Sequence, residues 1–103
     1  MYLIYFYVPL EHAEIVKAAV FNAGAGRIGN YSHCAWQTVG EGQFMAQKSA
    51  NPFVGKKNQL EILHECKIEM VCDDEHIHDA IAALKKIHPY ETPAYQVVRV
   101  ENF

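Results

Sequence analysis

Two short segments of this chain carry residues whose types could do chemistry. The first runs from His88 to Tyr95 and places Tyr90 and Glu91 between two prolines. Because proline fixes its own backbone torsion, the prolines present these side chains in a defined direction. A tyrosine hydroxyl beside a carboxylate can bind a polar ligand, or it can donate and accept protons. The same two residues could instead seal a contact between subunits, so these roles stay open.

The second segment is rich in glycine, and its letters match a dinucleotide-binding fingerprint. Gly24, Gly26 and Gly29 have the spacing GxGxxG. That fingerprint needs a strand before it and a helix after it, because the helix N-terminus receives the pyrophosphate. Here a predicted helix precedes the glycines and a predicted strand follows them, so we reject a dinucleotide site. The alternatives are a helix stop followed by a sharp turn, or a loop whose N–H groups and Arg27 bind an anion. The candidate ligand-binding residues are therefore Gly26, Arg27, Gly29, Asn30, Tyr31, Tyr90 and Glu91.

Six histidines in 103 residues suggest a metal site, and their spacing decides how it could form. His76 and His78 lie on a predicted helix and point about 200° apart, so they cannot chelate together. The chain has no HxxxH, CxxC or HExxH motif. A metal site would have to be assembled by the fold or between subunits, and a divalent metal ion is the candidate cofactor. The candidate ligands are His64, Cys66 and His88; the alternative is exposed histidines and small buried thiols.

Composition excludes several classes of partner. The net charge is −3 and no stretch concentrates Lys or Arg, so we expect no binding to nucleic acid. The apolar run Tyr2–Val8 follows no basic residue and is too short for a signal segment or a membrane span. Three cysteines without regular spacing do not form a disulfide framework. We therefore expect a cytoplasmic protein with no membrane partner.

The apolar periodicity predicts one α+β domain over residues 1–103. Its fold is a ferredoxin-like βαββαβ sandwich in which one hairpin is elaborated, with two helices on one face of an antiparallel sheet. The first half of the chain is predicted to hold a strand at Tyr2–Val8 covered on both faces, a helix at Glu11–Asn22, a strand at His33–Val39, a turn at Gly40–Gly42 and a short strand at Gln43–Ala46. A loop at 47–59 then leads to a strand at Leu60–Cys72. The chain ends with a helix, capped by Asp73 or Asp74 and with a buried stripe from Ile77 to Ile87, and a strand at Ala94–Val100.

The strand at Leu60–Cys72 is unusually long for so small a domain. Its even positions are apolar except His64, whereas its odd positions include Glu65 and Lys67, so one face should be wet. Thirteen residues would reach about 43 Å, and the body of a domain of this size is only about 35 Å across. Either the strand bends at a bulge, or one end projects past the domain and needs a neighbouring subunit to cover it. We favour the projecting strand.

These segments resemble a known family. His88-Pro89-Tyr90-Glu91-x-Pro93 resembles the helix-to-strand signature of CutA-type proteins, which are trimeric PII-like domains. Gly24–Tyr31, with Cys34, Trp36 and Gly42-x-Phe44, resembles the PII/CutA-like insert domain of bacterial YqfO proteins, the NGG-interacting-factor-like family. The resemblance covers essentially the whole chain and implies a homotrimer joined by extended strands. It also implies a stand-alone insert domain, without the two flanking regions that hold a two-metal centre in full-length relatives.

The leading hypothesis is a non-catalytic trimeric module that binds a small ligand or a metal ion and has a regulatory role. Its binding surface would combine the Gly24–Tyr31 loop with the His88–Tyr95 segment across a subunit interface. Two alternatives stay open. One is an enzyme that uses Glu91, Tyr90 and a histidine for acid–base chemistry, and the other is a purely structural oligomerisation module.

Overall fold

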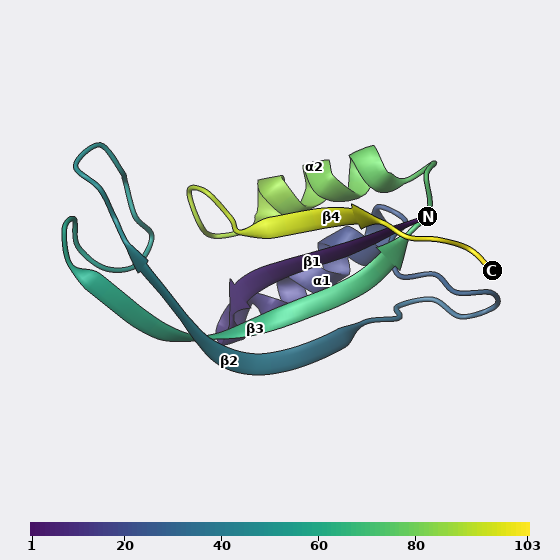
Figure 1. The fold of residues 1–103 in the computed structure, drawn as a ribbon, viewed down its shortest axis with the longest axis horizontal. Coiled ribbons are helices and arrows are strands. Elements are labelled where there is room, and N and C mark those ends of the chain that lie inside the picture. The colour runs from purple at the N-terminus through teal and green to yellow at the C-terminus, as the bar shows by residue number, and fades with distance from the viewer.

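A four-stranded antiparallel sheet forms the framework, and both helices lie on one of its faces (Figure 1). The computed structural model describes residues 1–103. The strand order is β2-β3-β1-β4, so β1 and β3 are the central strands. The elements in chain order are β1 (Tyr2–Pro9), the 3₁₀ turn η1 (Leu10–His12), α1 (Ala13–Asn22), β2 (Trp36–Met45), β3 (Leu60–Cys72), α2 (Ile77–Ile87) and β4 (Tyr95–Arg99). The predicted α+β, ferredoxin-like βαββαβ class is confirmed.

The core lies between the sheet and the helices. Alternate residues of the central strands point toward the helices, because side chains in a strand alternate between its faces. They meet the apolar stripes of α1 and α2, which recur at helical spacing. The core cluster includes Ile4, Phe6 and Val8 from β1, Cys66, Ile68 and Met70 from β3, Val16 and Val20 from α1, and Ala80 and Leu84 from α2.

The opposite face of the sheet carries no helix, and we call it the open face. Tyr5 and Tyr7 of β1 point to it and are only half-buried. Their partners across the ladder are Glu69 and Lys67 of β3. The prediction that the first strand is covered on both faces is therefore wrong, although the strand is interior to the sheet.

Strand β2 corrects a second prediction. The expected turn at Gly40–Gly42 does not form, and β2 runs unbroken for 10 residues. It pairs with β3 from Trp36 opposite Glu69 to Met45 opposite Leu60. Glycines favour turns locally, but the long ladder with β3 supplies hydrogen bonds that a hairpin here would lose. The elaborated hairpin is therefore absent.

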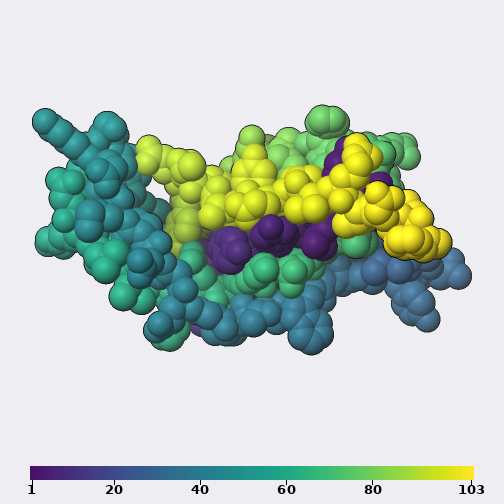
Figure 2. All heavy atoms as spheres, in the orientation of Figure 1, coloured from purple at the N-terminus to yellow at the C-terminus, as the bar shows by residue number.

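One end of the sheet projects as an arm, which we define as Glu41–His64. Strand β1 pairs with β3 only between Glu65 and Cys72, so Leu60–His64 have β2 as their single neighbour. The molecule measures 46 × 24 × 24 Å, and the arm extends beyond the helices along its long axis (Figure 1). The space-filling view shows the same arm standing out from the body (Figure 2). The predicted projection of the long strand is confirmed.

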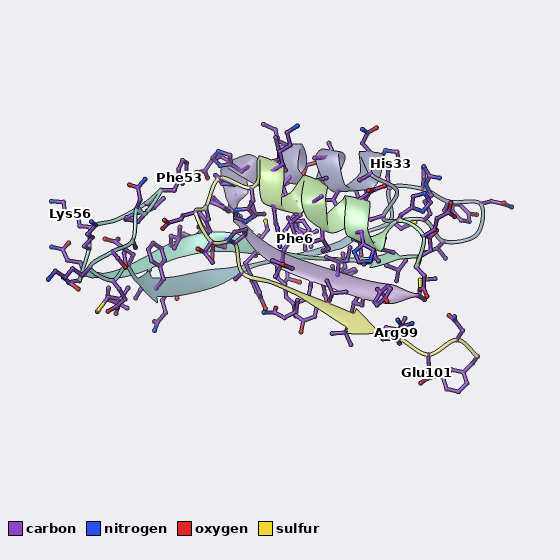
Figure 3. The ribbon with its side chains drawn as sticks, turned by 90° about the horizontal axis from the view of Figure 1, so that it is seen from above. Phe6, His33, Phe53, Lys56, Arg99 and Glu101 are labelled. Atoms are coloured by element: carbon purple, nitrogen blue, oxygen red, sulfur yellow. The ribbon has the colours of Figure 1, made fainter.

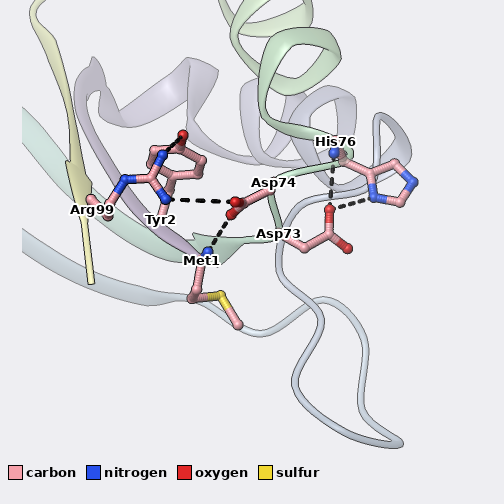
Figure 4. A network of polar contacts seen from close by, with 6 residues as sticks. All are labelled: Met1, Tyr2, Asp73, Asp74, His76 and Arg99. Carbon is pink, nitrogen blue, oxygen red and sulfur yellow. Dashed lines mark hydrogen bonds and ion pairs between the residues drawn. The ribbon is translucent and has the colours of Figure 1, made fainter. Parts of the chain in front are cut away.

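Polar contacts tie the other end of the domain together (Figure 4). Asp73 accepts hydrogen bonds from the backbone N–H of His76 at 2.9 Å and from its ring Nδ1 at 2.7 Å. Asp73 therefore closes the turn that leads into α2, and the bond from His76 lowers the pKa of the Asp73 carboxyl. The N-cap position of α2 is His76 and has no side-chain cap, so the prediction that Asp73 or Asp74 caps the helix itself is wrong. Asp74 lies 3.6 Å from the guanidinium of Arg99, which also covers the ring of Tyr2. Neither helix is long and apolar enough to cross a bilayer.

Candidate functional site

A cavity of about 780 Å³ lies between the open face of the sheet, the arm and the segment that leads into β4. Tyr7 and Glu65 contribute from the central strands, and Phe44 and Phe53 contribute from the arm. Tyr90, Glu91, Thr92 and Ala94 line the side next to β4. Sequence reasoning placed Tyr90 and Glu91 in the site, and the cavity supplies their surroundings.

Glu65 and Tyr90 form the polar centre of this cavity. The Tyr90 hydroxyl donates a hydrogen bond of 2.7 Å to Oε2 of Glu65. Glu65 is only 9% exposed, although the alternation of β3 placed it on a wet face. Burial, followed by the bond to Glu65, raises the pKa of Tyr90 well above its usual value. The hydroxyl therefore stays protonated and remains a donor to the carboxylate.

His88 holds the backbone that presents Tyr90. Its Nε2 donates to the carbonyl oxygen of Tyr7 at 2.7 Å, and its Nδ1 accepts from the N–H of Tyr90 at 3.1 Å. The residue is 6% exposed, and burial lowers the pKa of the His88 imidazole. Both ring nitrogens of the neutral imidazole are thus engaged, so His88 has a structural role in this chain.

Glu91 connects the arm to the body of the domain. Its Oε1 accepts a hydrogen bond of 3.0 Å from the backbone N–H of Asn51, which is 40 positions away in the sequence. The bond holds the loop between β2 and β3 against the segment before β4. This contact was not foreseen from the sequence, because nothing local to Glu91 indicates its partner.

Aromatic rings from the arm surround Tyr90. The ring centroids of Phe44 and Phe53 lie 6.5 and 6.3 Å from that of Tyr90. Phe53 also meets the ring of His12 edge-on at 5.6 Å. Such tilted contacts are favourable for aromatic pairs. Sequence reasoning missed both phenylalanines as site residues, although Gly42-x-Phe44 had been singled out as part of the resemblance.

The glycine-rich loop lies at the opposite end of the same chain. Gly26 donates its N–H to the carbonyl oxygen of Val71 at 2.7 Å, whereas Tyr90 binds Glu65. Val71 is six residue steps along β3 from Glu65, which corresponds to about 20 Å. Figure 3 shows His33, just beyond the loop, and Phe53 at different ends of the molecule. Within one chain, the two halves of the predicted ligand site do not meet.

The loop itself has the geometry of a sharp turn. Gly26 and Gly29 have φ of +78° and +56°, a region that favours glycine. Ile28 and Tyr31 exchange backbone hydrogen bonds across Gly29 and Asn30. Arg27, Asn30 and Tyr31 are exposed. The helix stop and turn are thus present, and exposed Arg27 is free to meet a group outside this chain.

The three candidate metal ligands are not gathered in one chain. No group of three or more His, Cys, Asp or Glu side chains is placed to hold a metal ion. Cys66 is 1% exposed in the core, and burial raises the pKa of its thiol. His64 is exposed on the arm, whereas both His88 nitrogens are engaged. A metal site that uses these residues would need groups from another subunit.

Comparison with solved structures defines the class of fold. CutA from Archaeoglobus fulgidus, described as a periplasmic divalent cation tolerance protein, has a TM-score of 0.70 and 19% identity, with 100% of this chain and 87% of that chain covered. The PII-like protein CutA from Nostoc has a TM-score of 0.70 and 19% identity, with 99% and 83% covered. The chain thus has a CutA/PII-like α+β fold.

Sequence comparison narrows the relationship. The chain is 45% identical over 91 residues to the GTP cyclohydrolase 1 type 2 homolog of Mycobacterium tuberculosis, with 88% of this chain and 24% of that protein covered. For the homolog of Bacillus subtilis, identity is 46% over 96 residues, with 93% and 26% covered. A Bacillus cereus protein related to NIF3 has a TM-score of 0.84 and 38% identity, with 98% and 26% covered. No protein-family model matches.

The matches therefore concern one region of larger proteins. The chain spans about a quarter of the length of the curated relatives it matches. The comparisons therefore support membership of the NIF3/YqfO-like family, with this chain as a partial domain.

Proposed function

We propose that this chain is an oligomeric module that binds a small organic ligand in the cavity beside the arm. The observation that carries the proposal is the cavity of about 780 Å³, which lies within the usual size range of ligand sites. Aromatic rings and a few convergent polar groups line it, as is typical of such sites. Tyr90 and Glu91 are the ligand-binding residues from the segment before β4, and Glu65 joins them.

The module binds its ligand without catalysis. Tyr90 and Glu65 satisfy each other through a hydrogen bond, and the raised pKa of Tyr90 opposes loss of its proton. His88 uses both ring nitrogens inside the chain. Neither Tyr90 nor His88 is thus poised for the proton transfer that acid–base catalysis needs. This argument disfavours the acid–base alternative.

The oligomer is a homotrimer that covers the arm. Leu60 and Ile62 are 54% and 58% exposed on the arm, and Met45 beside Leu60 is 47% exposed. They continue the core side of the sheet beyond the reach of the helices, and such apolar strands need a partner. In such a trimer, Arg27 or His64 of one subunit could lie beside the cavity of its neighbour and complete a ligand or metal site there.

The chain would serve larger proteins as an accessory module. The relatives are named homologs of GTP cyclohydrolase 1 type 2, and the chain corresponds to about a quarter of their length. We propose that ligand binding by the module regulates the remainder of such proteins. All three cysteines are free thiols, which fits a reducing cytoplasm.

Native mass spectrometry tests both parts of this proposal. The chain would be measured before and after addition of zinc, copper, nucleotides and small organic amines and acids. We expect a trimer that gains a stoichiometric added mass with one class of compound. A monomer would contradict the oligomer, and a trimer that ignores every addition would contradict ligand binding.

Two variants then locate the site. Glu91→Gln should weaken ligand binding while the trimer persists, because Glu91 lines the cavity. Arg27→Ala should weaken binding only if a neighbouring subunit completes the site, because Arg27 lies at the other end of its own chain. Unchanged binding in Glu91→Gln would contradict the assignment of the site to this cavity.

A further inference from the structure

The charged groups around the cavity are mostly acidic. Four glutamates and one lysine line it: Glu41, Glu65, Glu69, Glu91 and Lys67. Even without Glu41, whose side chain alternates to the other face of β2, three glutamates oppose one lysine. The lysine pairs with one of them, because its Nζ lies 3.9 Å from Glu69 Oε1 and 4.7 Å from the centre of the Tyr5 ring. Glu65 and Glu91 then remain as the acidic groups without a cationic partner in the cavity. The cavity therefore favours a positively charged occupant over an anion.

Glu65 supplies a nearly buried acceptor that the chain leaves incomplete. Its Oε2 accepts the bond from Tyr90, whereas its Oε1 has no hydrogen-bond donor in the chain. Oε1 points toward Gly42, since an added Cβ on Gly42 would lie 1.8 Å from it. Both residues line the cavity, and Glu65 is only 9% exposed. Oε1 is not sealed from the cavity, because His12 Nδ1 is the one side-chain polar atom that is fully buried without a partner. A donor or a positive charge in the cavity can therefore reach this oxygen and stabilise it.

Aromatic faces accompany this carboxylate. Phe44 and Phe53 flank Tyr90, and all three residues line the cavity. The faces of aromatic rings attract organic cations, and ammonium groups are bound in cages of such rings. A bare metal ion would instead require several donor side chains, and no group of three is placed to hold one.

We propose that the cavity selects an organic cation, an alkylammonium group, with Glu65 as its counter-ion and Phe44, Phe53 and Tyr90 as its aromatic walls. This inference rests on the proposed ligand-binding function and specifies the class of ligand. The contact between Glu91 and the Asn51 N–H holds the Phe53 loop beside the site.

A pair of probes of equal shape isolates the effect of charge. Choline carries a quaternary ammonium group, and 3,3-dimethylbutan-1-ol is its neutral counterpart. Each would be titrated into the 103-residue chain while backbone amide signals are followed by NMR. We expect saturable shifts at Gly42, Phe53 and Tyr90 with choline, and binding of the neutral alcohol weaker by about tenfold. Equal affinity for the two probes would overturn the inference.

Two variants test the assigned groups independently. Glu65→Gln removes the charge at nearly constant size, so the preference for choline over the alcohol should fall toward one. Phe53→Leu removes an aromatic face from a side chain that is 53% exposed, and it should weaken choline binding roughly threefold. Glu101→Gln changes the net charge equally on an exposed residue outside the cavity, and it should leave both affinities unchanged.

The outcomes separate this inference from the proposed function. If the neutral alcohol or a nucleotide shifts the cavity amides more strongly than choline, the module binds ligands but the cation preference is wrong. If no compound shifts them, both proposals fail. Unaltered choline binding in both Glu65→Gln and Phe53→Leu would also overturn the inference. If one of these variants folds poorly, unaltered binding in the other, folded variant has the same meaning.

Discussion

Gly42 of β2 and Glu65 of β3 are so close that a side chain at position 42 would have to displace the Glu65 carboxylate. A Cβ added to Gly42 would lie 1.8 Å from Oε1 of Glu65 and 2.8 Å from its Cδ. The missing side chain makes room for the carboxylate, which in turn accepts the hydrogen bond from Tyr90. One glycine in the arm thus permits the polar centre of the cavity.

Gly42→Ala should destabilise the chain by about 2 kcal/mol, because the new methyl group displaces Glu65 and leaves its bond to Tyr90 poorly made. Urea unfolding measures this free energy. Gly40→Ala is the matched control, since a Cβ at Gly40 meets nothing within 4 Å in the same strand. We expect a change within about 0.5 kcal/mol there. Equal effects at both glycines would contradict the steric argument.

Tyr90→Phe should cost about 1–3 kcal/mol, because it removes the donor to a carboxylate that is nearly buried. A double-mutant cycle with Glu65→Gln should give a coupling energy of about 1 kcal/mol. Tyr31→Phe serves as the control, since Tyr31 is 75% exposed. Additive effects of the two cavity substitutions, measured by urea unfolding, would show that the bond contributes little.

The stability of the chain should fall below a pH of about 6.5 through His88. Burial holds the pKa of folded His88 below its ordinary value of 6.5, so the unfolded chain binds a proton more readily. The stabilisation is present above the unfolded pKa and is lost as the pH falls through the folded pKa. Protonation would also place a proton on Nδ1, which accepts the N–H of Tyr90.

NMR titration of the His88 ring checks this prediction directly, and a midpoint at or above 6.5 would contradict it. Unfolding free energies between about pH 7.5 and 5 give a second measurement. His88→Gln should flatten their dependence on pH. His78→Gln, at an exposed histidine of α2, should leave that dependence unchanged.

Glu91→Ala should release the loop between β2 and β3. Without the carboxylate, the Asn51 N–H loses its acceptor, and hydrogen exchange at that amide should accelerate roughly fivefold. Thr92→Ala changes the neighbouring exposed position and should leave the exchange rate as it is. Similar exchange in all three proteins would mean that the bond does not hold the loop.

Ile62→Lys should break the oligomer without unfolding the subunit. The side chain is 58% exposed on the arm, so only a neighbouring subunit would bury it. A charge placed in such an interface is costly. Light scattering after size exclusion would report the loss of mass. Ile15→Lys on α1 is a matched control, with the same change at a residue that is also 58% exposed; an equal response would argue against the arm as the interface.

Local patterns predicted the regular elements well. The bounds of β3 were predicted without error, because strict alternation of apolar and polar residues is a local property of a strand. The apolar stripe of α2 was equally accessible, since residues on one helical face recur every three or four positions. Asp73 was correctly placed just before that helix, although it bonds to His76 in the preceding turn and does not cap the helix itself. The predicted turn at Gly40–Gly42 was wrong, because glycine occurs both in turns and in strands that another side chain approaches closely.

The composition of the site could be predicted only in part. Tyr90 and Glu91 were found because two prolines and a helix end draw attention to them in the sequence. Glu65 was placed on a wet face, and its burial depends on a tyrosine 25 positions away. The places of Phe44 and Phe53 in the site could not be predicted, because both depend on contact between the arm and the body of the domain. No local sequence pattern indicates that contact.

The sequence by itself determined the class of fold, the long projecting strand and the rigid segment around Tyr90. Those features follow from periodicity, capping and proline geometry, all of which act over a few residues. Tertiary structure decided which side chains share the cavity and that Arg27 lies far from it in one chain. Such decisions depend on strand register, because a shift of one residue reverses the face to which every side chain points.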